Sequence, residues 1–270
     1  MSVKVTFDTN VWQKVVQPAD YLSDENYCDF CCINQAIKDG HIQPFIVQTI
    51  FDLEALMKKS RLGYLSNYKP SVKCDEKVEG GKIVLTFSIG PDENNPIEGN
   101  AFVDKYLQMA QRLGFRVLSA PRIGMPRNNK AFEFIKAHSI GDLPNMEEVS
   151  KVSSDIDSLG AGMGFLNEFL SHYSSESNIQ RRIQAVPPTA AKSFAKAIAE
   201  MCDGESVAAH IAAGNDYYCT SDAARGAGTK SVFAASNVHY LQTKWGFRKV
   251  STAELCKILC EYKDCREDFA

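Results

Sequence analysis

The chain has 270 residues, of which 44% are apolar, and this is enough for a buried core in one large domain or in a core with an insertion. Its apolar runs are well short of the ~18 residues that cross a bilayer, and its first ten residues lack the apolar stretch of a signal peptide, so we expect a cytoplasmic protein with no membrane partner. The net charge of −3, from 30 basic and 33 acidic residues, argues against tight nonspecific binding of long nucleic acid but allows a local basic patch.

The nine cysteines are expected to be reduced thiols. Their number is odd and no secretory segment accompanies them. The alternative is a zinc site, but the candidate ligands do not repeat a two-knuckle spacing and have no histidine nearby. Those candidates are Cys28, Cys31, Cys32, Cys256 and Cys260.

The chain begins with a strand pattern that stops on an acid. Apolar and polar residues alternate over 3–7, and Asp8 and Asn10 follow directly. Helix patterns come next, over residues 11–16 and 27–38. The first acid of interest is therefore expected at the end of a strand.

A second strand pattern, at residues 43–47, precedes an expected helix. Thr49 opens this helix, with Asp52 three residues on as a variant of the capping box. Glu54 follows Ile50 by four residues, so it lies on the face that turns inward. Because carboxylates are rarely buried without a partner, an inward Glu54 implies a cation or a hydrogen-bond network.

The middle of the chain has a different pattern. Two strand patterns, at residues 72–74 and 82–87, flank Gly80-Gly81 and predict a hairpin. A helix is expected over 102–113 and a strand over 115–118. Residues 64–97, which include this hairpin, are expected to be an insertion that forms a lid or a partner surface.

The loop after that strand is basic. Arg122 and Arg127 lie in a segment, 112–130, that contains no acid, so they can clamp phosphates, although a solvated loop explains them equally well. Residues 141–160 are polar and acidic, and we expect them to be the most mobile segment. A helix is expected over 165–173.

Two further acids bracket the stretch from Asp203 to Asp222. Asp203 follows a helix expected over 190–202 and opens a second one, where capping and the helix dipole favour an acid. Residues 217–220 read as a buried strand, and Ser221 and Asp222 leave its carboxyl end. Open α/β sheets place their ligand crevices outside such strand ends.

The last part of the chain adds two cations near this crevice. Arg225 and Lys230 lie in or beside a loop of small residues after Asp222, where a substrate phosphate would lie. The remaining expected elements are a short strand at 232–233, a helix over 237–244, a strand over 247–250 and a last helix opened by a capping box at Ser251.

These stretches resemble the PIN-domain nucleases. The resemblance is carried by VTFDTN at 5–10, by FIVQTIFDLEAL at 45–56, by Asp203 followed eleven residues later by Gly214, and by GNDYYCTSD at 214–222. It covers roughly the first 60 and the last 70 residues, and the four motifs together are more specific than any one of them.

The resemblance implies a fold and a set of site residues. The fold is a three-layer α/β/α, Rossmann-like arrangement with a mostly parallel sheet, in which 1–63 and 198–270 form the core and 64–197 is an insertion with a hairpin and helices. Acids that converge on a divalent metal in that family correspond here to Asp8, Glu54, Asp203 and Asp222. Their small polar neighbours correspond to Asn10 and to Thr220 or Ser221.

We therefore expect a metal-dependent phosphodiesterase, specifically an endoribonuclease. Mg²⁺ or Mn²⁺ would be held by Asp8, Asp203 and Asp222, while Glu54 ligates or orients the attacking water. Glu205 is the substitute for Asp203. Each acid alone is more often a cap or turn residue, and it is the set that indicates a metal site. The residues expected to contact substrate are Asn10, Ser221, Arg225, Lys230, Arg122 and Arg127.

Two alternatives remain at this point. The first is a catalytically silent PIN-like module that binds RNA or a protein. The second, a nucleotide-binding α/β protein, is remote because the chain has no GxxxxGK[ST] or GxGxxG loop. The expected partner is RNA. The resemblance also allows the toxin of a toxin–antitoxin pair, with an antitoxin-like inhibitor, although the chain is longer than compact toxins; a homodimer is left open.

Overall fold

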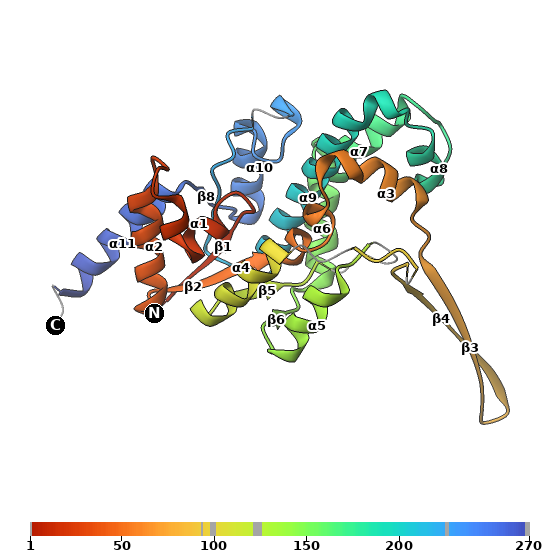
Figure 1. Cartoon of the computed structure of the whole chain (residues 1–270), viewed down its shortest axis with the longest axis horizontal. Coiled ribbons are helices and arrows are strands. Elements are labelled where there is room, and N and C mark those ends of the chain that lie inside the picture. Colours follow the sequence, from red (N-terminus) through yellow and green to blue (C-terminus); the bar gives the residue numbers. More distant parts are fainter. Residues whose placement is uncertain (1, 93, 98–100, 121–125, 225–226, 268–270) are drawn as a thin grey trace.

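The structure is a computed structural model that describes residues 2–92, 94–97, 101–120, 126–224 and 227–267 (Figure 1). Its centre is a six-stranded sheet in the order β6-β5-β2-β1-β7-β8, and every neighbouring pair is parallel. The strands are β1 (Val3–Phe7), β2 (Ile42–Val47), β5 (Arg116–Leu118), β6 (Gly141–Asp142), β7 (Tyr217–Cys219) and β8 (Lys249–Val250).

Helices cover both faces of the sheet, as burial of strands on two sides requires. Val5 and Phe7 belong to a core shared with helices of one layer, whereas Tyr218 packs with helices of the other. The first layer contains α1 (Trp12–Val16), α2 (Tyr27–Lys38), α4 (Ala101–Leu113), α5 (Asn129–Ala137) and α11 (Thr252–Glu267). The second contains α6 (Met146–Ser158), α9 (Ala191–Ala212) and α10 (Ala235–Trp245). The α/β class with a parallel sheet is confirmed, and the layering is compatible with α/β/α.

A second, all-helical core adjoins the sheet. It is formed by α3 (Arg61–Asn67), α7 (Gly162–Ser171), α8 (Ile179–Gln184) and the amino-terminal half of α9. The carboxyl-terminal half of α9 instead packs on the sheet, where Ala209 meets Phe45 and Leu118. The 22 residues of α9 therefore connect the two cores.

The predicted hairpin is present and stands apart. β3 (Ser71–Glu79) and β4 (Lys82–Gly90) pair with each other in a separate antiparallel sheet that extends away from the body (Figure 1). Gly80 and Gly81 form its turn with φ values of 58° and 78°, a conformation that costs glycine little.

Three expectations about local structure are wrong. Residues 191–212 form one continuous helix, so Asp203 lies in its middle and does not begin a helix. The helix expected from Thr49 is replaced by short 3₁₀ turns. Residues 141–160, which we expected to be the most mobile segment, contain α6, and its Val152 and Ile156 are buried against α9. Residues 232–233 form a turn with no strand. The 3₁₀ turns are η1 (Pro18–Tyr21), η2 (Gln48–Ile50), η3 (Leu53–Ala55), η4 (Lys58–Ser60), η5 (Pro188–Ala190) and η6 (Gly228–Lys230).

The expected insertion over 64–197 contributes to the main sheet. β5 pairs with β2, and β6 pairs with β5, so both strands extend the core sheet from within that range. Of the strands that the structure describes in 64–197, only those of the hairpin lie outside it. Among the helices described, none is both long and apolar enough to span a bilayer.

Candidate active site

The candidate site lies where the strand order reverses. Going along the chain, β1, β2, β5 and β6 run toward one edge of the sheet, and β7 returns to the other side of β1. Asp8 follows β1, and its backbone N–H donates to the carbonyl of Cys219 at the end of β7 over 3.0 Å. The carboxyl ends of two neighbouring strands thus meet at the switch point, the usual position of a ligand crevice in an open α/β sheet.

The carboxylate of Asp8 is buried and held by three donors. Its Oδ2 accepts hydrogen bonds from Thr220 Oγ1 over 2.5 Å and from Asn10 Nδ2 over 2.8 Å, and its Oδ1 accepts from the backbone N–H of Thr9 over 2.7 Å. Burial raises the pKa of Asp8, and the neighbouring charge of Asp222 adds to this increase, while the three donors oppose it.

Asn10 and Thr220 connect the two strand ends. Asn10 Oδ1 accepts from the backbone N–H of Ser221 over 3.1 Å, and Thr220 Oγ1 accepts from that of Asp222 over 2.9 Å. Of the two small polar residues considered at this position, Thr220 is the one that contacts an acid. The Ser221 residue is exposed, and the only contact described for it here is through its backbone.

Glu54 joins the site from a 3₁₀ turn. Its Oε2 accepts a short hydrogen bond from the hydroxyl of Thr9. The turn is fixed by Arg61, a buried side chain that donates to the carbonyl of Glu54 over 3.4 Å and to that of Ala195 over 3.0 Å. Thr9 and Arg61 were not predicted, because their roles depend on contacts across long sequence separations.

Asp203 lies in the middle of α9 and interacts electrostatically with the other acids. Burial raises the pKa of Asp203 well above its usual value, and the charges of Asp8, Glu54, Glu200 and Asp222 raise it further. The four predicted acids therefore come from four separate segments and act on one another electrostatically, and they are called the acid cluster below.

Glu200 is a fifth acid that the sequence did not single out. It precedes Asp203 by one helical turn, is 5% exposed, and its Oε2 has no hydrogen-bond partner among the described residues. Burial raises the pKa of Glu200, with a contribution from the charge of Asp222. The three-residue spacing could have found it, but a helix break placed at Cys202 separated the two acids.

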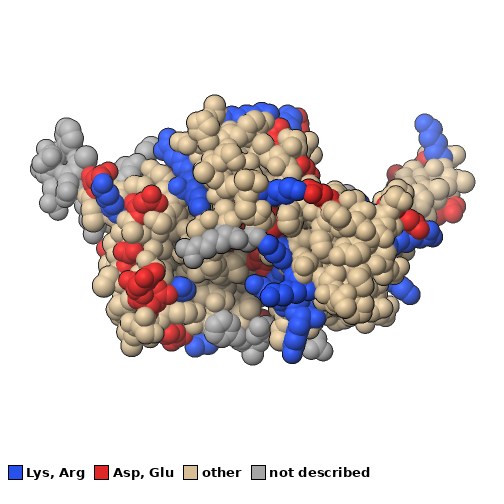
Figure 2. Space-filling view, turned by 90° about the horizontal axis from the view of Figure 1, so that it is seen from above, with Lys and Arg blue, Asp and Glu red and all other residues tan. Residues whose placement is uncertain are grey.

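The predicted cations do not gather at the acids in the part of the chain described. Lys230 pairs with Glu168 over 2.5 Å, and the guanidinium of Arg127 lies 4.1 Å from the ring centre of Phe132. Lys249, which was not predicted, donates from Nζ to the carbonyl of Asp222 over 2.6 Å. Arg122 and Arg225 lie outside the described residues. Figure 2, a view from above, shows Lys and Arg side chains gathered near the middle of that face.

The carboxylates of the acid cluster are the type of ligand that a hard cation prefers, but in this structure they are not close enough together to coordinate one. Carboxylates are the ligands that Mg²⁺ and Mn²⁺ prefer. Among the described residues, no three His, Cys, Asp or Glu side chains are close enough together to hold a metal ion. The eight cysteines whose side chains are described are free thiols, and in the described part of the chain they form no group that could hold zinc.

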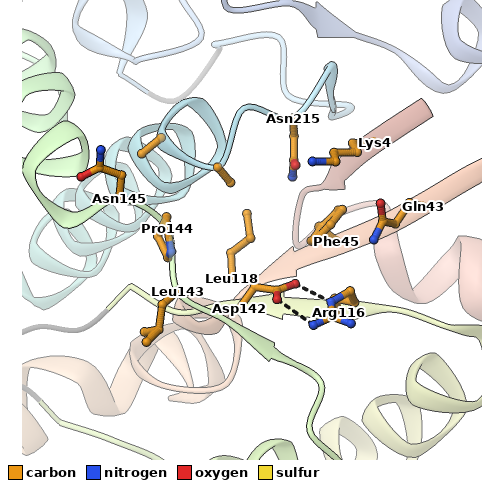
Figure 3. A pocket seen from close by; sticks show the side chains of 12 residues that line it. Lys4, Gln43, Phe45, Arg116, Leu118, Asp142, Leu143, Pro144, Asn145 and Asn215 are labelled. Carbon is orange, nitrogen blue, oxygen red and sulfur yellow. Dashed lines mark hydrogen bonds and ion pairs between the residues drawn. The ribbon is translucent and has the colours of Figure 1, made fainter. Parts of the chain in front are cut away.

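A separate cavity of about 350 Å³ lies on the sheet toward the starts of β1, β2 and β5 (Figure 3). Lys4, Gln43 and Asn215 border it, and Arg116 forms a two-pronged ion pair with Asp142 at its rim. None of the acids of the acid cluster lines this cavity, so the two sites are distinct.

Comparison of the chain with protein-family models, with curated proteins and with solved structures found no match.

Proposed function

We propose that this protein is a metal-dependent phosphodiesterase that cleaves RNA internally. The observation that supports this most strongly is the acid cluster at the switch point of the sheet, where the charges of Asp8, Glu54, Glu200 and Asp222 all act on the buried Asp203. Buried like charges of this kind are costly to a fold unless protons or a cation neutralise them. A divalent cation bound by these carboxylates would neutralise their charge and remove the repulsion between them.

Asp8, Asp203 and Asp222 are the residues that would hold Mg²⁺ or Mn²⁺. When bound, such an ion lowers the pKa of a coordinated water and neutralises charge on a phosphate. Asn10 and Thr220 hold the Asp8 carboxylate in one orientation, and the Thr9 hydroxyl orients Glu54. Glu54 would accept a proton from the attacking water, and Lys249, which donates to the carbonyl of Asp222, supplies a positive charge beside the acid cluster.

The test is cleavage of labelled RNA and single-stranded DNA by the purified chain with Mn²⁺, Mg²⁺ or EDTA. We expect cleavage of RNA that needs the metal and that falls at least about 100-fold in Asp8→Asn, because a ligand oxygen is lost. Asp75→Asn is the matched control, since it removes an exposed carboxylate on the distant hairpin. Equal cleavage by wild type and Asp8→Asn would contradict the proposal.

The second candidate is a catalytically silent module that binds RNA or a protein. It is favoured by one observation, that the described carboxylates do not approach closely enough to form a metal group. This candidate predicts no cleavage with either metal and RNA binding that Asp8→Asn leaves unchanged. The same cleavage panel therefore separates the two functions.

A further inference from the structure

The hairpin carries an apolar face that none of the described residues of its own chain covers. The ladder pairs Val72 with Ile89 and Val78 with Ile83, and opposite residues in an antiparallel ladder share a face. The face contains, from base to tip, Val72, Ile89, Cys74, Phe87, Glu76, Leu85, Val78 and Ile83, and it is called the apolar hairpin face below. Its six large apolar residues are 50–71% exposed.

The hairpin is held firmly at its root, so the exposed face is presented in a fixed place. Tyr68 is buried, and its hydroxyl accepts a hydrogen bond from the backbone N–H of Asp92 over 3.0 Å. The Asp92 carboxylate accepts from the backbone N–H of Lys69 over 3.0 Å. Beyond this clamp, β3 and β4 have extensive contact only with each other among the described elements.

An exposed two-stranded sheet with such a face needs a cover. Isolated hairpins are marginally stable in water, and the six apolar residues expose on the order of 600 Å² together, at the upper limit for a patch on a monomer and near the ~800 Å² that one partner contributes to a stable interface. The single charge on the face is that of Glu76, which is acidic, so the face has no attraction for nucleic acid or for an anionic membrane. Both the area and the charge favour a protein surface that is itself apolar.

We infer that the cover is the apolar hairpin face of a second copy of this chain. The rows of the face read the same from either end: an aliphatic pair at the base, two mixed pairs in the middle, and an aliphatic pair at the tip. When two copies stack with antiparallel arms, the Val72 and Ile89 row meets the Val78 and Ile83 row of the partner, and Phe87 meets the partner's Leu85. A two-fold axis makes this contact closed, so it ends at two copies.

The opposite face of the hairpin supplies the matched control. Val84 lies on β4 beside Leu85 but points to the polar face, which carries Lys73, Asp75 and Lys77. Val84 is 40% exposed and Phe87 is 66% exposed, so neither substitution by Lys removes an interior contact. Phe87→Lys and Leu85→Lys place a charge inside the inferred interface, whereas Val84→Lys places it outside.

The experiment measures the mass of the full chain by sedimentation equilibrium over a range of concentrations. We expect two copies for the wild type, a dissociation constant raised at least about tenfold in Phe87→Lys and in Leu85→Lys, and a value within about threefold of wild type in Val84→Lys. Alkylation of the Cys74 thiol, read by mass spectrometry, should slow as the wild type dimerises. The inference does not depend on the proposed catalysis.

Three results would overturn the inference. The first is a wild-type chain that stays monomeric at every concentration, whether or not the hairpin binds a vesicle or another protein. The second is a dimer whose dissociation constant is unchanged by Phe87→Lys and by Leu85→Lys, which would place the interface elsewhere. The third is an equal loss of dimer in Val84→Lys, which would mean that charge on either face, or a damaged hairpin, causes the effect.

Discussion

His210 is a buried histidine that is separate from the acid cluster. It is 1% exposed, and its Nδ1 lies 2.9 Å from the hydroxyl of Thr6 in the central strand. The rings of Tyr218 and Phe247 contact it edge-on. Burial lowers the pKa of His210 to about 3, so the folded protein holds it neutral at any pH above that value.

This histidine should make the fold sensitive to acid. The unfolded chain takes up a proton at His210 below pH ~6.5, whereas the folded chain does not until about pH 3, so stability is complete above pH 6.5 and falls as the pH drops through this window. We expect a loss of up to about 1.4 kcal/mol per pH unit from this group. Urea unfolding of wild type and His210→Gln at several pH values measures the difference, which cancels the contributions of carboxylates. Parallel curves for the two proteins would refute it.

The helix α9 depends on a close approach of two glycines. A Cβ built on Gly204 would lie 2.7 Å from Cα of Gly162, which itself has φ of 58° at the start of α7. Because the two backbones touch at this point, α9 lies close to α7, and the neighbouring Asp203 stays in the acid cluster. The small residue at 204 is thus a packing requirement rather than a helix break.

Gly204→Ala should therefore be harmful even though alanine favours helices. We expect a loss of about 1–3 kcal/mol in the free energy of unfolding, because the added methyl meets backbone that cannot move aside alone. Gly63→Ala in α3 is the control, since a Cβ there meets nothing within 4 Å, and we expect a gain of up to about 1 kcal/mol. Thermal unfolding of both variants decides this, and a stabilised Gly204→Ala would show that α7 yields.

At the scale of the whole molecule, α9 links the acid cluster to both hydrophobic cores. Its amino-terminal half packs among α3, α7 and α8, and its carboxyl-terminal half packs on the sheet. Glu200 and Asp203 lie at the junction between these halves. A cation held by the acid cluster would thus bind the folded state and not the unfolded chain, so its binding would raise the free energy of unfolding of the whole protein.

We expect Mn²⁺ to raise the melting temperature of the wild type. A concentration 100 times the dissociation constant adds about 2.7 kcal/mol to the free energy of unfolding. Asp203→Asn should melt higher than the wild type in EDTA, because a raised pKa means that its ionised form opposes folding, and it should gain little from Mn²⁺. Calorimetry with and without Mn²⁺ tests both statements, and an equal shift in the two proteins would show that the metal binds elsewhere.

Much of the fold could be predicted from local patterns. The alternation before Asp8, the apolar run before Asp222 and the Gly80-Gly81 turn each reflect a preference that neighbouring residues express on their own. The capping box at Ser251 is also confirmed, since its backbone N–H donates to Glu254 Oε2 over 2.7 Å. The acids at strand ends could be predicted because they directly follow these local strand patterns.

The sequence by itself determined which residues end the strands, and therefore that Asp8 and Asp222 lie at one edge of a parallel sheet. Only the tertiary structure decided that α9 continues through Asp203 and that Glu54 lies on a turn fixed by Arg61. It also decided that Glu200 belongs to the acid cluster. The physical reason is range. Local preferences act over a few residues and differ by about 1 kcal/mol or less, whereas burial against distant segments contributes more and overrides them.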